Sequence, residues 1–129
     1  MMTYEMNLNR QPFDMIKSGR KTIELRLNDE KRKNIMAGDK IMFTSPCGDT
    51  MLCIVKHVHN FPTFKELYES LPLDKCGYLP EEIPSASYKD MEEYYPIEKQ
   101  QKHSVLGIEI ALINGYEKSN IYRHRQHTP

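Results

Sequence analysis

The chain has 129 residues, and its 18 basic and 18 acidic side chains give a formal net charge of zero. Hydrophobic residues make up 39% and charged residues 28%, a balance typical of a folded domain rather than a disordered segment. No apolar run approaches the roughly 20 residues that cross a bilayer, which excludes a membrane-spanning helix. We expect one domain over residues 1–115, followed by a polar C-terminal tail over residues 116–129.

The cysteines and the N-terminus indicate a reducing compartment. The first five residues lack the basic and apolar regions of a signal peptide, so we expect a cytoplasmic protein. Cys47, Cys53 and Cys76 are odd in number and widely spaced, which favours free thiols. No CxxC pair is present, and the pair His57 and His59 has no evident third ligand. We therefore predict neither a metal site nor a cofactor.

Charge is distributed unevenly along the chain. Seven basic and four acidic residues lie between Gly19 and Lys40, whereas three basic and nine acidic residues lie between Thr63 and Glu98. A basic face suits a nucleic-acid ligand. Two oppositely charged faces are equally consistent with solvated surfaces, so both interpretations stay open.

Alternating apolar residues predict five short strands. In the fourth strand, we expect Leu52, Ile54 and Val58 to be buried. The near-continuous apolar run of the last strand predicts burial on both faces, at least in part. The expected strands cover residues 3–8, 21–27, 40–44, 51–60 and 104–114.

Helices are expected between these strands. Pro12 suits the first turn of a helix over residues 11–18. Thr63 and Glu66 have the spacing of a capping box for a second helix, and Ser87 is placed to cap a third. The remaining expectations are a helix over residues 63–71, a broken region with three prolines over 72–86, a helix over 87–95 and a turn over 96–102.

Short strands separated by helices indicate a mixed α+β fold, a small barrel of about five to six strands with inserted helices. The strands are too short and uneven for a doubly wound parallel sheet. The opening strand, helix and strand suit a parallel pair, because the crossover helix that such a pair needs is present.

Residues 19–26 carry the most chemistry. Ile23, Leu25 and Leu27 alternate with Thr22, Glu24 and Arg26, so the polar set is expected on an exposed or cleft-facing surface. Two cations beside a carboxylate are suited to holding phosphate, a base edge or a small polar ligand. A surface ladder of ion pairs without a ligand is the alternative.

The same stretch carries a resemblance. Gly19-x-Lys21-Thr22-x-Glu24-x-Arg26, preceded by Pro12-Phe13-x-x-Ile16, resembles the opening of an ASCH domain, a family of PUA-like barrels associated with RNA. Two further patches resemble the family's turn into its next strand and its last helix and strand. They are Ala37-Gly38-Asp39-x-Ile41-x-Phe43, and Tyr94-Tyr95 followed by residues 105–110.

The resemblance implies a PUA-like barrel with a cleft between the strand of Lys21, Glu24 and Arg26 and the helical region. Members of the family bind RNA or nucleoside-like ligands, and some are described as ribonucleases. One small bacterial branch hydrolyses the amide of N4-acetylcytidine. This chain keeps that branch's lysine as Lys21, but Glu24 replaces its threonine. Glu81 or Glu82 stands where the branch has a further glutamate.

Candidate ligand contacts follow from these patterns. Tyr94 is suited to stacking on a base, although Tyr88, Met91 and Tyr95 form a stripe that equally suits core packing. Lys31 belongs to a short basic run that suits phosphates or a solvated face. The expected RNA or ligand contacts are Arg20, Lys21, Thr22, Glu24, Arg26, Lys31, Tyr94, His103 and Ser104.

Three functions remain open. The first is an RNA- or nucleotide-binding protein, with RNA or a nucleoside-like small molecule as partner. The second is a small hydrolase acting on a modified nucleoside or on RNA, with Lys21 and Glu24 as catalytic residues. The third is a protein-interaction module that uses the acidic helical segment.

Overall fold

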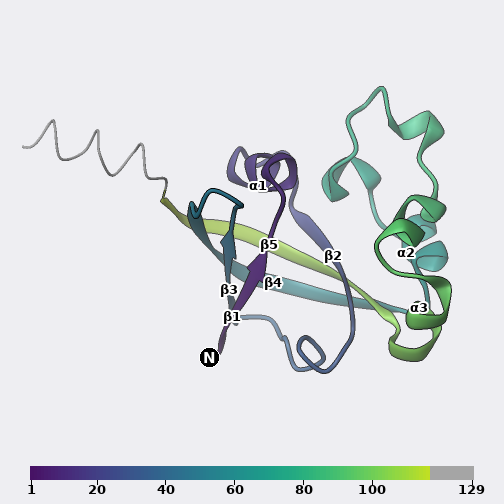
Figure 1. Ribbon diagram of the computed structural model, residues 1–129, viewed down its shortest axis with the longest axis horizontal. Helices are drawn as coiled ribbons and strands as arrows, with labels where there is room; N and C mark the ends of the chain where they lie inside the picture. Colours follow the sequence, from purple (N-terminus) through teal and green to yellow (C-terminus); the bar gives the residue numbers. More distant parts are fainter. Residues whose placement is uncertain (117–129) are drawn as a thin grey trace, which may run out of the picture.

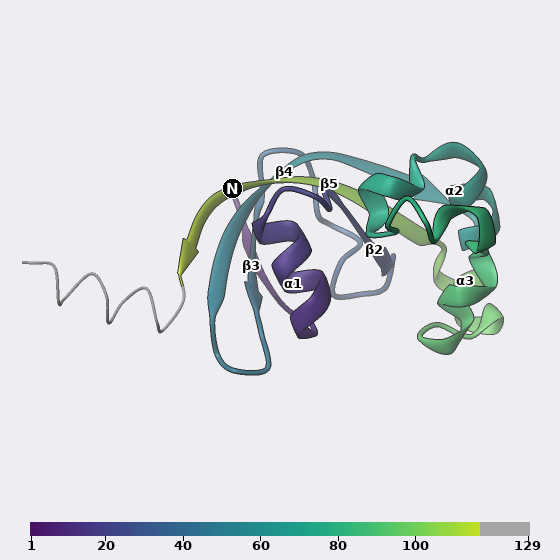
Figure 2. The same ribbon diagram turned by 90° about the horizontal axis from the view of Figure 1, so that it is seen from above.

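The computed structural model describes residues 1–116; residues 117–129, most of the predicted polar tail, lie outside the described residues. The described residues form one five-stranded sheet in the order β1-β3-β4-β5-β2. Figure 1 and Figure 2 show the long strands β4 and β5 curving across the molecule side by side, which curls the sheet. The strands are β1 (Thr3–Asn7), β2 (Ile23–Leu27), β3 (Lys40–Thr44), β4 (Thr50–Phe61) and β5 (Val105–Tyr116).

Helix α1 (Arg10–Lys17) lies beneath the curled sheet, whereas the other helices gather at one end of β4 and β5 (Figure 2). We call residues 62–103, which connect β4 to β5, the insertion. None of the helices in residues 1–116 is long and apolar enough to cross a membrane. The insertion contains α2 (Phe64–Ser70), three 3-10 helices, η1 (Leu73–Cys76), η2 (Ile83–Ser85) and η3 (Tyr88–Glu93), and then α3 (Ile97–His103). The predicted mixed α+β architecture with inserted helices is therefore confirmed.

The parallel pair of strands differs from the expectation. β1 pairs in parallel with β3, not with β2, and β2 pairs antiparallel with β5 at the opposite edge of the sheet. Helix α1 therefore carries the chain from one edge of the sheet to the other. A crossover helix permits a parallel pair but does not specify which strand becomes the neighbour.

The fourth strand also differs in length and in its buried face. β4 and β5 have twelve residues each, so these two are not short. The prediction that Leu52 and Ile54 are buried is wrong, because both side chains are only half-buried. The inner face of the strand is occupied by Met51, Cys53 and Val55 instead. Residues 51–55 are apolar on both faces, so the sequence pattern does not indicate which face of the strand is buried.

Two apolar clusters hold the fold together. The α1-side cluster lies between α1 and the sheet and includes Phe13, Phe43 and Ile108. The insertion-side cluster includes Phe64 and Leu67 of α2 together with the apolar residues of β2. The first residues of β5 are buried in both directions, since Leu106, Ile108 and Ile110 belong to the former and Val105 to the latter. Burial on both faces of the last strand is confirmed for this part.

The predicted cap of α2 is confirmed, because Thr63 and Glu66 form a reciprocal capping box. Ser87 and Asp90 form a second box, but the segment that they cap is the 3-10 helix η3 rather than the expected α-helix. Residues 72–86 form turns and the short helices η1 and η2, as the three prolines predict.

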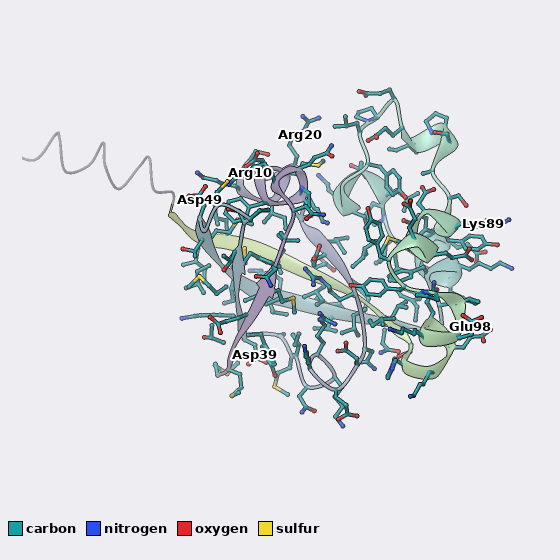
Figure 3. All side chains as sticks on the ribbon, viewed as in Figure 1. Arg10, Arg20, Asp39, Asp49, Lys89 and Glu98 are labelled. Carbon is teal, nitrogen blue, oxygen red and sulfur yellow. The ribbon has the colours of Figure 1, made fainter. Side chains whose placement is uncertain are left out.

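Arg10 ties α1 to the β3–β4 turn. Its guanidinium donates to Asp49 Oδ2 and to Ser45 Oγ, both at 2.8 Å, and lies 5.2 Å from the centre of the Phe13 ring. Figure 3 shows Arg10 and Asp49 side by side at this edge of the sheet. This contact fixes one end of α1, whose neighbouring residues reach the site described next.

Candidate functional site

A cleft of about 930 Å³ separates the α1 side of the domain from the insertion. Lys21, Glu24 and Arg26 line it from β2 and the turn before it. On one side it is bounded by residues 7–9, at the end of β1, and by Ser45, which follows β3. The opposite side comes from the insertion and is rich in tyrosine: Tyr68, Tyr78, Tyr94 and Tyr95.

The floor of the cleft is a buried cluster of charges. Glu24 is 3% exposed, and it is bound from both sides: Lys21 Nζ lies 2.8 Å from Oε1, and Arg26 Nε lies 2.6 Å from Oε2. Arg26 Nη2 also donates to the carbonyl of Asn7 at 2.8 Å. The surface ladder of ion pairs is therefore not what the chain forms, because all three groups are largely withdrawn from water.

Strand pairing explains why Glu24 is buried. Glu24 lies opposite Ile108 of β5, and Arg26 lies opposite Leu106, so both face the α1 side of the sheet. Ile23, Leu25 and Leu27 face the insertion-side cluster instead. The predicted alternation is correct, and a second layer of structure covers the polar face as well.

The charges of this floor stabilise one another. Burial alone would raise the pKa of Glu24, but the charges and hydrogen bonds of Lys21 and Arg26 outweigh burial and hold that pKa below its usual value. Burial opposes the charged form of Arg26 too, yet the Glu24 carboxylate keeps the pKa of Arg26 above its ordinary value. Glu24 is consequently ionised at neutral pH, which suits it to accept hydrogen bonds.

Cys76 also lines the cleft, beside this cluster. Burial raises the pKa of its thiol to about 12, although the positive charge of Lys21 opposes the shift. The thiol is therefore protonated at neutral pH, which does not suit a nucleophile.

Backbone hydrogen bonds to the insertion and to α1 hold the turn before β2 in place. Thr22 N donates to the carbonyl of Lys75 at 2.9 Å, and Lys21 N donates to the carbonyl of Met15 at 3.0 Å. The stem of Lys21 passes Gly77 so closely that a Cβ on that glycine would lie 3.3 Å from Lys21 Cδ. Gly77 has a φ of 110°, which residues with a side chain rarely adopt, so glycine suits both the turn and the close contact with Lys21.

Gln100 and Tyr95 connect the insertion internally. Gln100 is 2% exposed; its Oε1 accepts from Phe64 N at 3.0 Å, and its Nε2 donates to the carbonyl of Tyr95 at 2.7 Å. The Tyr95 ring stacks on Phe64 with 5.9 Å between ring centres. These contacts hold Tyr95 at the edge of the cleft, beside Arg26.

The structure brings together four of the nine predicted ligand residues, since Lys21, Glu24, Arg26 and Tyr94 line the cleft. Tyr94 is 65% exposed there, whereas Tyr88, Met91 and Tyr95 pack on the insertion-side cluster. Within residues 1–116, the other five predicted residues are not part of the cleft lining: Arg20, Thr22, Lys31, His103 and Ser104. Their assignment to a ligand stays a prediction.

Local structure explains where those five residues lie. Arg20 is exposed in the turn after α1 and points outward (Figure 3). Lys31 is exposed in the turn that follows β2. His103 and Ser104 lie at the C-terminal end of β2, where Ser104 has a φ of 65° and its Oγ accepts from the amides of Asn28 and Asn60.

Several cleft residues of the insertion were not singled out by the sequence analysis, Tyr68, Tyr78 and Asp90 among them. Tyr68, Tyr78 and Asp90 all line the cleft, and Glu82 lines it whereas Glu81 is not among its lining residues within the described chain. Tyr68 lies on α2, where it packs partly buried against the insertion-side cluster. Tyr78 lies in a proline-rich segment without periodicity, so the sequence carried no signal for it.

His57 and His59 lie on the outer face of β4, away from the cleft lining. Their ring centres are 4.3 Å apart, and His59 Nε2 lies 2.5 Å from Glu109 Oε2 on β5. Within the described residues, no group of three or more His, Cys, Asp or Glu side chains is arranged to hold a metal ion.

Comparisons with solved structures find proteins of the same fold. The hypothetical protein PH0355 is 34% identical, with a TM-score of 0.73 over 87% of this chain and 100% of that one. Protein PF0455 from Pyrococcus furiosus is 31% identical, with a TM-score of 0.64 over 87% of this chain and 98% of that one. A variant of the ASCH protein from Zymomonas mobilis shares the fold at 12% identity, with a TM-score of 0.62 over 100% of this chain and 85% of that one.

No curated protein matches the chain. The sequence pattern of the ASCH domain matches residues 6–114, a range that includes every residue of the cleft lining. The PUA-like curled sheet of this chain, with its inserted helices, is the architecture that the resemblance implied. The chain belongs to the ASCH domain family.

Proposed function

We propose that this protein binds RNA or a nucleoside-like molecule by taking a single base into the cleft. The observation that carries the proposal is the buried Lys21–Glu24–Arg26 cluster on the floor of a cleft whose opposite wall is lined by tyrosines. An ionised carboxylate suits an exocyclic amine of a base, as carboxylates do with cytosine. The exposed ring of Tyr94 suits stacking on the face of a base.

The charges around the cleft favour a base over a phosphate. Its described lining carries two cations, Lys21 and Arg26, and four carboxylates, Glu24, Glu82, Asp90 and Glu93. Glu24 already neutralises part of the positive charge, so a phosphate entering the cleft would meet an excess of negative charge. Any phosphates of the ligand would then lie outside, near exposed cations such as Lys31 or Arg20.

Hydrogen-bonding capacity remains on the floor of the cleft. The Lys21 ammonium has three hydrogens and Glu24 accepts one of them, while a carboxylate has about four acceptor positions and receives two known donors here. Donor and acceptor thus stand side by side, 2.8 Å apart. This pair complements a base edge, which also presents a donor next to an acceptor.

The test is a thermal-shift and calorimetric comparison of cytidine, uridine, adenosine and guanosine with their 5′-monophosphates. We expect at least one nucleoside to bind, and cytidine at 100 times its dissociation constant would add about 2.7 kcal/mol of stability. Lys21→Met should abolish nucleoside binding, whereas the matched control Lys31→Met should retain it and weaken only the salt-dependent binding of RNA. Absence of binding to every nucleoside and to short RNAs would contradict the proposal.

A hydrolase is the second candidate, favoured by the position of Glu82 in the same cleft as Lys21. Hydrolysis of N4-acetylcytidine would break the amide C–N bond by addition of water, and would release acetate and cytidine. The pairing of Glu24 with two cations weakens it as a general base, because its pKa is held low. Acetate release by the wild type that disappears in Lys21→Met would support this activity. If no compound in a panel of acylated nucleosides is turned over, the hydrolase candidate is refuted.

A further inference from the structure

Three polar side chains of the cleft wall form a chain of hydrogen bonds. Tyr78 Oη donates to Asp90 Oδ2 at 2.7 Å, and Tyr68 Oη lies 2.7 Å from Tyr78 Oη. The two tyrosine rings also meet edge to face, with centres 5.9 Å apart and planes at 82°. All three residues line the cleft.

The direction of this chain follows from proton counting. A phenol has one hydrogen, and Tyr78 gives its hydrogen to the carboxylate of Asp90, so Tyr68 must donate to Tyr78. Asp90 Oδ2 also accepts from Ser87 N at 3.2 Å as part of the cap of η3. The Tyr78 hydroxyl therefore joins α2, the segment that follows η1, and η3 at one point.

The same segment touches the turn that carries Lys21. Gly77 precedes Tyr78 and lies against the stem of Lys21, and Lys75 holds the backbone of Thr22 at 2.9 Å. A movement of residues 75–78 would therefore displace the Lys21 side chain directly. Residues 75–78 are in turn held to the rest of the insertion through Tyr78.

We propose that Tyr78 is a positioning residue of the cleft: with Tyr68 and Asp90, its hydroxyl holds residues 75–78 against Lys21 and sets where the Lys21 ammonium lies. This inference deepens the proposed binding of a base and, in its consequence for affinity, rests on it. The tyrosine chain is distinct from the floor cluster because it contacts neither Glu24 nor Arg26 through any described hydrogen bond.

The experiment uses Tyr78→Phe, which removes one oxygen and keeps the ring. Tyr88→Phe is the matched control, because Tyr88 packs on the insertion-side cluster, as Tyr68 does, and its hydroxyl has no hydrogen bond within the described residues. Both are made in a Cys47→Ser background, since that cysteine is exposed. Cys76, which lines the cleft, then reports opening of the wall, and Cys53 in the α1-side cluster reports global unfolding.

We expect Tyr78→Phe to accelerate labelling of Cys76 by a thiol reagent about tenfold, because two hydrogen bonds are lost from the wall. Acetylation of Lys21, followed by mass spectrometry, should accelerate as well, with Cys53 labelling unchanged. Tyr68→Phe should have a smaller effect, since it leaves the bond to Asp90 intact. Cytidine should bind Tyr78→Phe about tenfold more weakly than the wild type.

Two outcomes of the labelling experiment would overturn the positioning role. One is an unchanged rate at Cys76 and Lys21; the other is an equal acceleration at Cys53, which would indicate general destabilisation. Both rates are measured without ligand, so they decide the inference even if cytidine fails to bind the wild type, a result that counts against the proposed function alone. Wild-type affinity for cytidine in Tyr78→Phe would refute the positioning role and leave the proposed function standing.

Discussion

The α1-side cluster and the insertion-side cluster pack against opposite faces of β5, yet they are built differently. Long-range strand pairing and fully buried side chains, Phe13, Ile41 and Phe43 among them, make up the former. The insertion-side cluster is completed by half-buried residues of the insertion, among them Tyr68 of α2 and Tyr88 and Met91 of the 3-10 helix η3. The cleft lies where these two kinds of packing meet, so a firmly held floor faces an adaptable wall.

This difference indicates how ligand recognition is divided. Glu24 and Arg26 belong to β2, which is hydrogen-bonded along its length to β5, and Lys21 lies in the turn just before it. The tyrosines belong to the insertion, whose contacts with the sheet are made mainly by side chains. A rigid floor preserves the geometry of the donor and acceptor, while the wall is the part expected to adjust to a ligand.

The largest expected effect is on the α1-side cluster. Phe43→Ala removes a ring with no exposed surface, and we expect it to lower the free energy of unfolding by about 3–5 kcal/mol. Phe61→Ala is the control; Phe61 is half-buried beside the insertion-side cluster and should cost less. Urea denaturation measures both, and an equal loss for the two variants would show that the clusters are equivalent in stability.

The second effect concerns the charged floor between the clusters. Glu24→Gln leaves Lys21 and Arg26 largely buried without their carboxylate, and we expect a loss of roughly 3 kcal/mol at pH 7. The pKa of Glu24 is lowered by folding, so its contribution is complete above the unfolded value of about 4.3 and is lost as pH falls through the lower folded value. The difference between wild type and Glu24→Gln should therefore shrink in acid.

Denaturation curves at pH 7 and at successively lower pH check this expectation. Other carboxylates titrate in both proteins, so the difference between the two isolates Glu24. Glu30→Gln is the control, since Glu30 is well exposed and pairs with Lys33 at the surface. A difference that grows toward low pH would contradict the charged state assigned to Glu24.

The two regions also differ in how far the sequence predicts them. The strands, α1 and the capping box of Thr63 follow from periodicity and local hydrogen bonding, which act over a few residues. The alternation around Glu24 identified the floor of the cleft, although a carboxylate between two cations does not by itself show burial. The pairing of β1 with β3 was missed, because the choice of neighbour depends on distant contacts.

The cleft wall that the insertion forms could not be predicted from the sequence. Tyr78 and Asp90 are brought together by turns whose conformation depends on Gly77 and on contacts with α2, not on any repeating pattern. His103 and Ser104, two of the expected ligand contacts, immediately precede the last strand. That strand begins beside the far end of β2, so proximity along the chain did not place them at the cleft.

A smaller effect is expected where the insertion meets the sheet. A Cβ on Gly107 of β5 would lie 2.6 Å from Leu71 Cδ1 just after α2, so Gly107→Ala must displace that side chain. We expect a loss of roughly 1 kcal/mol, at the low end for overpacking, because the clash is with the end of a flexible side chain. In a Leu71→Ala background the clash is gone, so Gly107→Ala should cost much less there. The double-mutant cycle of the two substitutions should therefore show a coupling energy.

The smallest effect is expected at Glu30 and Lys33, whose side chains meet at 2.8 Å and remain 84% and 47% exposed. The hydrogen bond and charge of Lys33 lower the pKa of Glu30, yet water and salt screen such a pair. Lys33→Ala should therefore leave the denaturation midpoint unchanged within error, at low and at high salt. Lys21→Ala makes the matched comparison, because it removes a lysine from a similar pair that is only 10% and 4% exposed. Equal effects of the two substitutions would mean that burial does not distinguish the cleft floor from an ordinary surface ion pair.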